Sequence, residues 1–335
     1  MKIALLRTWQ VNIGNGFIDK GAKALLNKAV PDAEVIEVSG YPNWAADRHD
    51  EGLLPQDTLG KQFEEQIKNK FKSKSTTQER MVNVAEYIDV DIAVLPGCVL
   101  TPWALDVYRP TLEHLQEQGT EIIFLGVGGG DYKSSTCRSV RKVLEDIDPA
   151  GILTRDKEAY KCYSDVAAQS HDGIDCAFYI SDWYEPPEVN TEISVHTFDK
   201  QEEPAINSPG EIIRPDHFPF KEPHGNIVQK YSKNRDQRTL LDERNNIFIS
   251  DILEDYLFFY SNSEVTHSDR IHACVPTLSY GNKAQFWFDT PRGKLFDKVL
   301  DKSIKSSPAK LDQERISRLK SEQTNVLQQI VKESS

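Results

Sequence analysis

The sequence has few cysteines, and no motif pairs them. The five cysteines among 335 residues are odd in number and scattered, and none stands in a C-x-x-C arrangement. A disulfide framework needs paired cysteines and a structural zinc site needs closely spaced ones, so the sequence predicts neither. We interpret the thiols as reduced, which indicates a cytoplasmic protein.

Long hydrophobic runs are also missing. The amino-terminal stretch MKIALLRTWQ has only four apolar residues between Lys2 and Arg7, too few for the core of a signal peptide. No run approaches the roughly 20 apolar residues that a membrane-spanning helix needs. We expect a protein without a membrane span that could still act at the inner face of the membrane through peripheral contact.

Positive charge is in short supply. The chain has 40 Lys and Arg against 52 Asp and Glu, a formal net charge of −12. This balance disfavours nucleic acid as a partner, and an anionic ligand would need a local basic pocket. Hydrophobic residues at 39% and charged residues at 27% are ordinary for a globular chain, and the length suits two domains that each bury a core. Composition leaves the oligomeric state open.

Residues 1–182 alternate short apolar runs with helical patterns. The apolar runs are rich in β-branched residues, as in strands buried on both faces, and lie at 2–6, 33–38, 91–96, 121–127 and 151–155. Helical patterns lie at 17–29, 78–88, 106–118 and 135–146. This alternation predicts a parallel, doubly wound sheet. The polar segment 43–80 is interpreted as an insertion with room for one helix.

A Pro-Pro pair among acidic residues at 180–192 predicts a linker. Further strand patterns follow at 192–198, 210–216, 245–250, 263–268 and 284–289, with helical patterns at 251–261 and 270–280. They predict a second domain, 183–307, in which 217–244 is an irregular loop. An amphipathic pattern at 309–333 predicts a C-terminal helix within 308–335. The expected fold class is therefore α/β, with two Rossmann-like domains facing a cleft and a C-terminal helix.

In parallel sheets ligands gather at the carboxyl ends of the strands, so the residues that follow each strand are candidates for binding. Asn12, Gly14 and Asn15 follow the first strand and open a helix. Small residues there allow backbone N–H groups to approach an anion at the helix N-terminus. A tight turn that needs glycine backbone angles explains the same pattern.

Three consecutive glycines, Gly128, Gly129 and Gly130, separate the fourth strand from the next helix. Three glycines in a row cost conformational entropy, which favours a close approach of a ligand or of another part of the backbone. The stretch fits neither the P-loop pattern nor the dinucleotide fingerprint, since the latter should follow the first strand.

Arg155 follows the fifth strand and can hold a carboxylate or phosphate through two hydrogen bonds. A surface ion pair is the alternative for this residue. The next residue, Asp156, is expected to cap the following helix.

The stretch SEVTHSDRIHACVPTLSYG concentrates charge where a strand gives way to a helix. Ser268, Arg270 and His272 fall at the strand end and in the first helical turn, where the helix dipole favours anions. A metal site formed by His267, Asp269 and His272 is disfavoured because the adjacent arginine repels a cation. We predict no metal site and assign His267 a structural role.

This stretch, extended to SDRIHACVPTLSYGNKAQFWFDTPRGK, resembles the C-terminal signature of the polysaccharide pyruvyl transferase family. The signature has a serine, an R-x-H pair, a helix of small residues, a glycine, a short strand and a distal lysine, here Lys294. An N-x-G loop after the first strand, GVGGG after the fourth and TRD after the fifth match in the same order, so the resemblance spans roughly residues 1–300. One departure concerns Asn15, which stands where the family has an aspartate; the acceptor chemistry can differ there.

The resemblance implies a fold like that of the GT-B glycosyltransferases and transfer of a pyruvyl group from phosphoenolpyruvate to two hydroxyls of a sugar, giving a ketal. The acceptor would be a sugar, polysaccharide or lipid-linked glycan, and no cofactor is needed beyond the donor. The donor carries a carboxylate and a phosphate, for which Arg155 and Arg270 are the expected anchors. His272 would supply a proton or stabilise the departing phosphate.

Two alternatives stay open. A glycosyltransferase that uses a nucleotide sugar would share the fold, but it needs an acid for the ribose and a surface for the base, and no convincing pair follows residue 245. A non-catalytic glycan-binding relative is the other alternative. The presence of Arg155, Arg270 and His272 argues against it.

Overall fold

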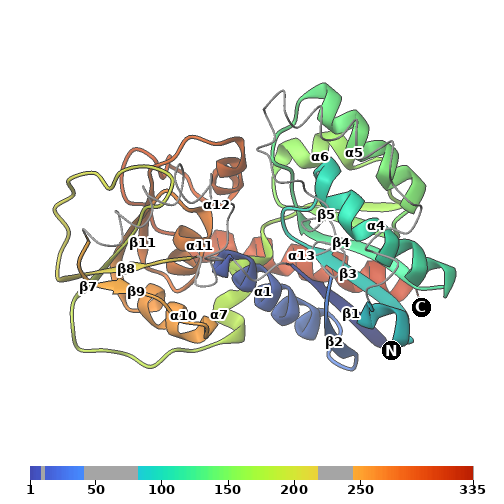
Figure 1. The fold of residues 1–335 in the computed structure, drawn as a ribbon, viewed down its shortest axis with the longest axis horizontal. Coiled ribbons are helices and arrows are strands. Elements are labelled where there is room, and N and C mark those ends of the chain that lie inside the picture. Colours follow the sequence, from blue (N-terminus) through green and yellow to red (C-terminus); the bar gives the residue numbers. More distant parts are fainter. Residues whose placement is uncertain (9–11, 41–81, 218–243, 335) are drawn as a thin grey trace, which may run out of the picture.

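The protein was analysed as a computed structural model, which describes residues 1–8, 12–40, 82–217 and 244–334. Two lobes lie side by side, each built on a parallel sheet (Figure 1). The sheet of the first lobe has strand order β2-β1-β3-β4-β5-β6, and the sheet of the second has order β11-β10-β7-β8-β9. The predicted α/β fold class, with two Rossmann-like units and a C-terminal helix, is confirmed; the exact boundaries at 182 and 307 stay predictions.

The first lobe follows the predicted alternation closely. Its strands are β1 Lys2–Arg7, β2 Glu34–Ser39, β3 Ile92–Pro96, β4 Glu121–Val127, β5 Gly151–Thr154 and β6 Gln169–Asp172. Its helices are α1 Ile13–Ala29, the 3-10 turn η2 Val84–Tyr87, α4 Pro102–Glu117, α5 Ser134–Ile147 and α6 Lys157–Tyr163. Asn12 and Thr101 cap α1 and α4 through their side-chain oxygens, which is why both helices begin earlier than their apolar periodicity suggests.

Two predictions in this lobe need correction. The helix expected at 78–88 is wrong for its described part, where η2 is a single 3-10 turn. Strand β6 was missed because its sequence, QSHD, is polar and lies half-buried at the sheet edge, so it lacks the apolar run that marks the other strands. The insertion expected at 43–80 lies outside the described residues.

The second lobe contains shorter elements. Its strands are β7 Ile193–Thr197, β8 Glu211–Pro215, β9 Ile247–Phe248, β10 Ser263–Ser268 and β11 Lys283–Phe286. Its helices are α10 Leu253–Ser261, α11 Ile271–Ser279, the 3-10 turn η4 Pro291–Leu295 and α12 Phe296–Val299. The loop predicted at 217–244 lies outside the described residues except at its two ends.

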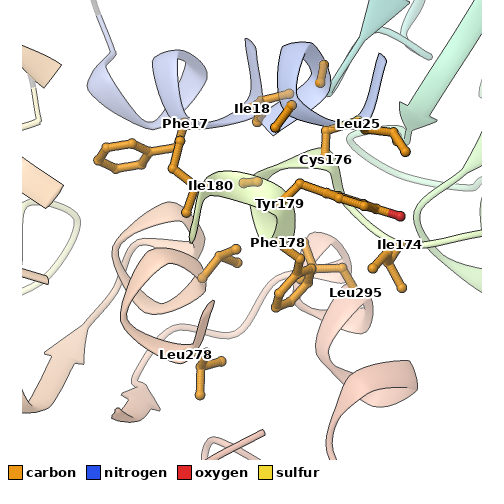
Figure 2. Packing of buried hydrophobic residues seen from close by; sticks show 14 of the residues in the cluster. Phe17, Ile18, Leu25, Ile174, Cys176, Phe178, Tyr179, Ile180, Leu278 and Leu295 are labelled. Atoms are coloured by element: carbon orange, nitrogen blue, oxygen red, sulfur yellow. The ribbon is translucent and has the colours of Figure 1, made fainter. Parts of the chain in front are cut away.

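The lobes share one apolar core rather than burying separate ones. The chain passes between them through the 3-10 turn η3, Cys176–Tyr179, and the short helix α7, Ile180–Trp183. Phe178 and Ile180 of this crossing are fully buried between α1 and the helices of the second lobe (Figure 2). One cluster extends from the first sheet through the crossing to the second sheet, while a further cluster covers the other face of the first sheet. The expectation of one core per half is therefore wrong.

The C-terminal helix α13, Gln313–Glu333, returns to the first lobe. It packs on α1, β5 and β6, and both chain ends lie on this lobe (Figure 1). Gly151 permits close packing, since a Cβ there would lie 2.7 Å from the Cδ1 atom of Ile330. Within the described ranges, none of the helices combines the length and apolar character that a bilayer span requires.

In both sheets the chain reverses its direction of strand addition once. The reversal lies between β1 and β3 in the first sheet and between β7 and β10 in the second. Such switch points create a crevice at the carboxyl ends of the flanking strands. The segments that follow β1, β3, β7 and β10 therefore flank the switch points, and the segment after β5 lies further along the same edge of the first sheet.

Candidate active site

Arg155, which directly follows β5, is buried at the junction of the lobes. Its side chain is 1% exposed, and its Nη1 donates to the Oδ2 atom of Asp175 at 2.8 Å. The Nε and Nη2 atoms are also enclosed and have no hydrogen-bond partner among the described residues. A buried guanidinium with unused N–H groups is costly unless an acceptor reaches it. Arg155 is therefore the best-placed group for an anion.

His272 meets the same carboxylate from the second lobe. It is the second residue of α11, and its Nε2 lies 3.3 Å from Asp175 Oδ2. Because an ionised carboxylate only accepts hydrogen bonds, we assign the proton of the neutral ring to Nε2 and the lone pair to Nδ1. Asp175 thus joins Arg155, which follows β5, to His272 of α11.

Charge states follow from this arrangement. Burial alone would raise the pKa of Asp175, but His272 and Arg155 outweigh it and hold this pKa well below its usual range. Burial lowers the pKa of His272; Asp175 opposes this effect, while Arg155 and Arg292 add to it. Since the charge of Arg155 is permanent, Asp175 stays ionised. The unliganded site therefore holds a neutral imidazole beside an ionised aspartate at neutral pH.

Two of the predicted glycines make room for these side chains. A Cβ on Gly14 would lie 2.8 Å from the Cβ of His272, and one on Gly128 would lie 2.5 Å from Arg155 Nε. The Gly128 N–H and C=O are used by backbone bonds to Gly97 and Leu100. At Gly128 the close approach is thus made by the Arg155 side chain, where a ligand or another part of the backbone was predicted; the binding role of the glycines stays a prediction.

Arg270 is held by a different aspartate. Its guanidinium pairs with Asp199, which follows β7, and its Nε lies 2.6 Å from Asp199 Oδ2. Burial lowers the pKa of the neighbouring Lys200, and the charges of Arg270 and Arg292 lower it further. The carboxyl end of the second sheet thus gathers Arg270, Lys200 and Arg292, whose charges are partly balanced by the carboxylates of Asp199 and Asp269.

The two cations of η4 lie in different surroundings. Lys294, taken from the sequence as a site residue, is 49% exposed, and its Nζ is 3.6 Å from Glu158 of α6. Arg292 has a buried Nε with no partner among the described residues. Its charge acts on both His272 and Lys200. Arg292 is the better candidate of the two for contact with an anion.

Asn12 and Ser268 form hydrogen bonds with the nearby backbone. Asn12 accepts from Gly14 N–H at 3.1 Å, and Ser268 Oγ donates to Thr197 O and accepts from Arg270 N–H, both at 2.8 Å. Asn15 is half-buried in the first turn of α1.

The rest of the glycine run lies at the start of the segment between β4 and α5. Gly129 N–H donates to the Tyr132 hydroxyl at 2.9 Å, and Tyr132 in turn donates to Asp156. The nearest atom to a Cβ built on Gly130 is Thr101 Cγ2 at 3.6 Å. Asp156 caps α6 through Ala159 N–H, as expected.

The residues weighed as metal ligands have separate partners. Trp287 Nε1 donates to His267 Nδ1 at 3.2 Å, and Asp269 accepts from the N–H groups of Lys200 and Gln201. In the part of the chain that the structure describes, no three His, Cys, Asp or Glu side chains gather as a metal site would require. The assignment of no metal site stays a prediction.

Sequence reasoning missed Asp175, Asp199, Lys200 and Arg292. Asp199 and Lys200 directly follow a predicted strand, so reading each strand end would have found them. Arg292 lies two residues before the lysine of the signature. Asp175 follows β6, the strand that was itself missed, and its role as the cap of η3 gives no sign of its pairing with Arg155.

Comparison with known families gives a decisive match. The model of the polysaccharide pyruvyl transferase family matches residues 12–282. The chain belongs to the polysaccharide pyruvyl transferase family. The match covers the segments that carry Arg155, Asp175, Arg270 and His272, and it ends before η4 and α13.

Solved structures are more distant. An uncharacterised protein from Klebsiella pneumoniae is 11% identical over 88% of this chain and 85% of its own, with a TM-score of 0.45. A UDP-GlcNAc 2-epimerase from Neisseria meningitidis bound to UDP-GlcNAc is 12% identical over 98% and 94%, with a TM-score of 0.47. The E. coli heptosyltransferase is 9% identical over 85% and 88%, with a TM-score of 0.34. A search of curated proteins finds no match.

Proposed function

We propose that this pyruvyl transferase family member moves the pyruvyl group of phosphoenolpyruvate onto two hydroxyls of a sugar in a polysaccharide or glycan precursor. The observation that supports this most is the buried chain Arg155–Asp175–His272, in which an arginine with unused N–H groups and a neutral imidazole share one aspartate. Family membership supports a sugar or glycan acceptor.

The donor is an anion with two charged groups, and the site offers separate cations for them. Arg155 has two free buried N–H positions, and Arg292 has one. Arg270 and Lys200 add positive charge at the end of the second sheet. Guanidinium groups match the planar geometry of carboxylates and phosphates, which favours Arg155 and Arg292 as the direct contacts.

His272 is suited to proton transfer. Its pKa is lowered by burial, so the unliganded ring is neutral, but an anion bound beside it would favour the charged form. Donor binding would thereby load a proton on Nδ1 for delivery to the terminal enol carbon. The resulting oxocarbenium-like centre is attacked by one sugar hydroxyl. Loss of phosphate and attack by the second hydroxyl close the ketal, and the two hydroxyl protons balance the new methyl C–H bond and the released hydrogen phosphate.

The deciding experiment incubates the protein with phosphoenolpyruvate and candidate glycans while phosphate release and ketal formation are followed. We expect phosphoenolpyruvate to raise the melting temperature, since a ligand of the native state stabilises it by mass action. A large shift with UDP- or GDP-sugars and none with phosphoenolpyruvate would favour the nucleotide-sugar alternative. Binding of glycan without any turnover would favour the non-catalytic alternative.

Variants separate the proposed roles. Arg155→Ala should weaken donor binding most, and Arg155→Lys should restore it poorly, because lysine offers a point charge in place of a planar fork. His272→Ala should lower turnover by about 10²–10⁴-fold with a smaller effect on donor affinity. His272→Gln can donate a hydrogen bond but cannot deliver a proton. Recovery of the rate in that variant would make His272 a binding residue only.

The proposed donor and acceptor also suggest where in the cell the protein works. We expect the protein to work in the cytoplasm, with the inner face of the membrane as its location if the acceptor is a lipid-linked glycan. Co-sedimentation with vesicles that carry such an acceptor would test the second expectation.

A further inference from the structure

The segment that carries Asp175 is enclosed from several sides. A Cβ on Gly21 of α1 would lie 2.0 Å from the carbonyl oxygen of Cys176, and one on Gly126 of β4 would lie 2.6 Å from the Cys176 Sγ. Both glycines therefore allow the chain at 173–177 to lie directly against α1 and β4. The position of Asp175 is set by these contacts and by one from the C-terminal helix.

That further contact comes from Gln323 of α13. Its amide forms both hydrogen bonds of a peptide-like pair with Ile174: Ile174 N–H donates to Oε1 at 2.6 Å, and Nε2 donates to Ile174 O at 3.2 Å. Glycine at position 173 leaves room for this amide, because a Cβ there would lie 2.3 Å from the Gln323 Oε1 atom. The pairing fixes the residue immediately before Asp175.

Gln323 occupies a position where the helix pattern calls for an apolar residue. The buried apolar residues of α13 recur at helical spacing, at Ile316, Leu319, Leu327, Ile330 and Val331. Gln323 lies on the same face and is 0% exposed. A buried amide costs free energy unless its groups are bonded, and a leucine would fill the space without that cost. The amide is therefore explained by its two bonds to Ile174.

We propose that Gln323 is a positioning residue for the candidate active site: through Ile174 it holds Asp175 where the carboxylate meets both Arg155 and His272. Gln323 and Ile174 are 149 residues apart in sequence. Gln323 also lies outside residues 12–282, the part that matches the family model. The C-terminal helix therefore helps to position the residues of the candidate active site. The effect on catalysis rests on the proposed function, whereas the effect on His272 does not.

The test measures His272 directly. In ¹⁵N-labelled protein the ring signals of the eight histidines are titrated by NMR, and His272 is identified as the signal missing from His272→Gln. Gln323→Met keeps the length of the side chain and removes both bonds. Because Asp175 raises the pKa of His272, displacement of Asp175 should lower that pKa, and the midpoint of the His272 titration should move to lower pH than in wild type.

Three further variants make the test specific. Gly173→Ala crowds the same amide from the other side, so it should shift the His272 titration in the same direction and decides the matter if Gln323→Met does not fold. Gln323→Glu keeps an oxygen that accepts from Ile174 N–H, and when burial protonates the carboxyl it also keeps a donor to Ile174 O. His272 in this variant should therefore titrate as in wild type. Leu327→Ala removes a buried side chain of α13 that does not bond to Ile174, so it should lower stability but leave His272 unchanged.

Once the donor and acceptor are established, the same variants should differ in their kinetic constants. Gln323→Met should lower kcat by about 10-fold or more with less change in donor KM, since a small misplacement of a reacting group acts mainly on the chemical step. A His272 titration identical to wild type in both Gln323→Met and Gly173→Ala, or an equal shift in Leu327→Ala, would overturn the proposal. Absence of any pyruvyl transfer with an altered His272 titration would contradict the proposed function and leave the positioning role intact.

Discussion

Gly14 of the first lobe and His272 of the second are in direct contact, with no room for a side chain between them. A Cβ on Gly14 would lie 2.8 Å from the His272 Cβ. Gly14 lies in the first turn of α1, after β1, and His272 lies in the first turn of α11, after β10. The two switch points of the fold therefore meet at this pair, and the first lobe helps to set the position of His272.

Gly14→Ala should displace His272. Alanine is favoured over glycine in a helix by up to about 1 kcal/mol, so any loss must come from the new contact. We expect overpacking to cost about 1–3 kcal/mol of stability and a displaced imidazole to lower turnover by about 10²-fold. Thermal unfolding and phosphate release measure the two effects.

Gly16→Ala is the matched control for that variant. It also adds a methyl group to α1 that crowds the second lobe, but its Cβ would meet Leu253 Cδ1 at 2.9 Å, away from His272. It should lower the melting temperature and keep the turnover number. Equal loss of turnover in both variants would mean that the fit of the lobes, and not the position of His272, controls the rate.

Asp175→Asn should make His272 less basic. The amide oxygen can still accept from Arg155, but the charge that raises the pKa of His272 is gone, so this pKa should fall further below its ordinary value. Since His272 must carry the proton that it delivers, the alkaline limb of the kcat/KM profile should then move to lower pH, and turnover should fall by about 10²–10⁴-fold. Histidine NMR and a pH–rate profile check this. An unmoved His272 titration would show that Asp175 does not govern the ring.

Acid should destabilise the protein in part through His267. Burial lowers its pKa from 6.5 to about 4, helped by His196, and the Nδ1 lone pair accepts from Trp287. The unfolded chain binds a proton as the pH falls through 6.5 while the folded chain does not. This residue therefore removes about 1.4 kcal/mol of stability per pH unit from pH 6.5 down to about 4.

Urea unfolding of wild type and His267→Gln at pH 7.5, 6 and 5 measures that contribution. Gln can still accept from Trp287 but cannot take up a proton, so the variant should lose less stability on acidification. Parallel profiles for the two proteins would show that His267 titrates as it does in the unfolded chain.

Chelators should leave activity unchanged. His267, Asp269 and His272 are engaged by Trp287, by backbone N–H groups and by Asp175, and they do not converge. Dialysis against EDTA should therefore preserve turnover, and added divalent ions should not raise it. Loss of activity that Mg²⁺ or Zn²⁺ restores would require a metal site in this protein.

The described fold followed largely from local patterns. The runs at 121–127 and 151–155 are apolar throughout, and only a strand covered on both faces buries such a run, so strand positions in a parallel sheet could be predicted. Ligands bind at the carboxyl ends of parallel strands, and these ends are known once the strands are placed. Arg155, Arg270 and His272 could therefore be predicted as site residues as well. Polar β6 offered no such pattern.

Sequence by itself determined the two parallel sheets, the terminal helix, the family signature and the strand ends that carry charge. Tertiary structure alone decided which charges pair: Asp175 lies 20 residues from Arg155 and 97 from His272. Hydrophobic periodicity reports which face of an element is buried, but the partner of a buried charge depends on how elements cross in space. For that reason Asp175 and Gln323, a cap and a helix residue by local pattern, took their places beside the site only once the lobes and α13 had packed together.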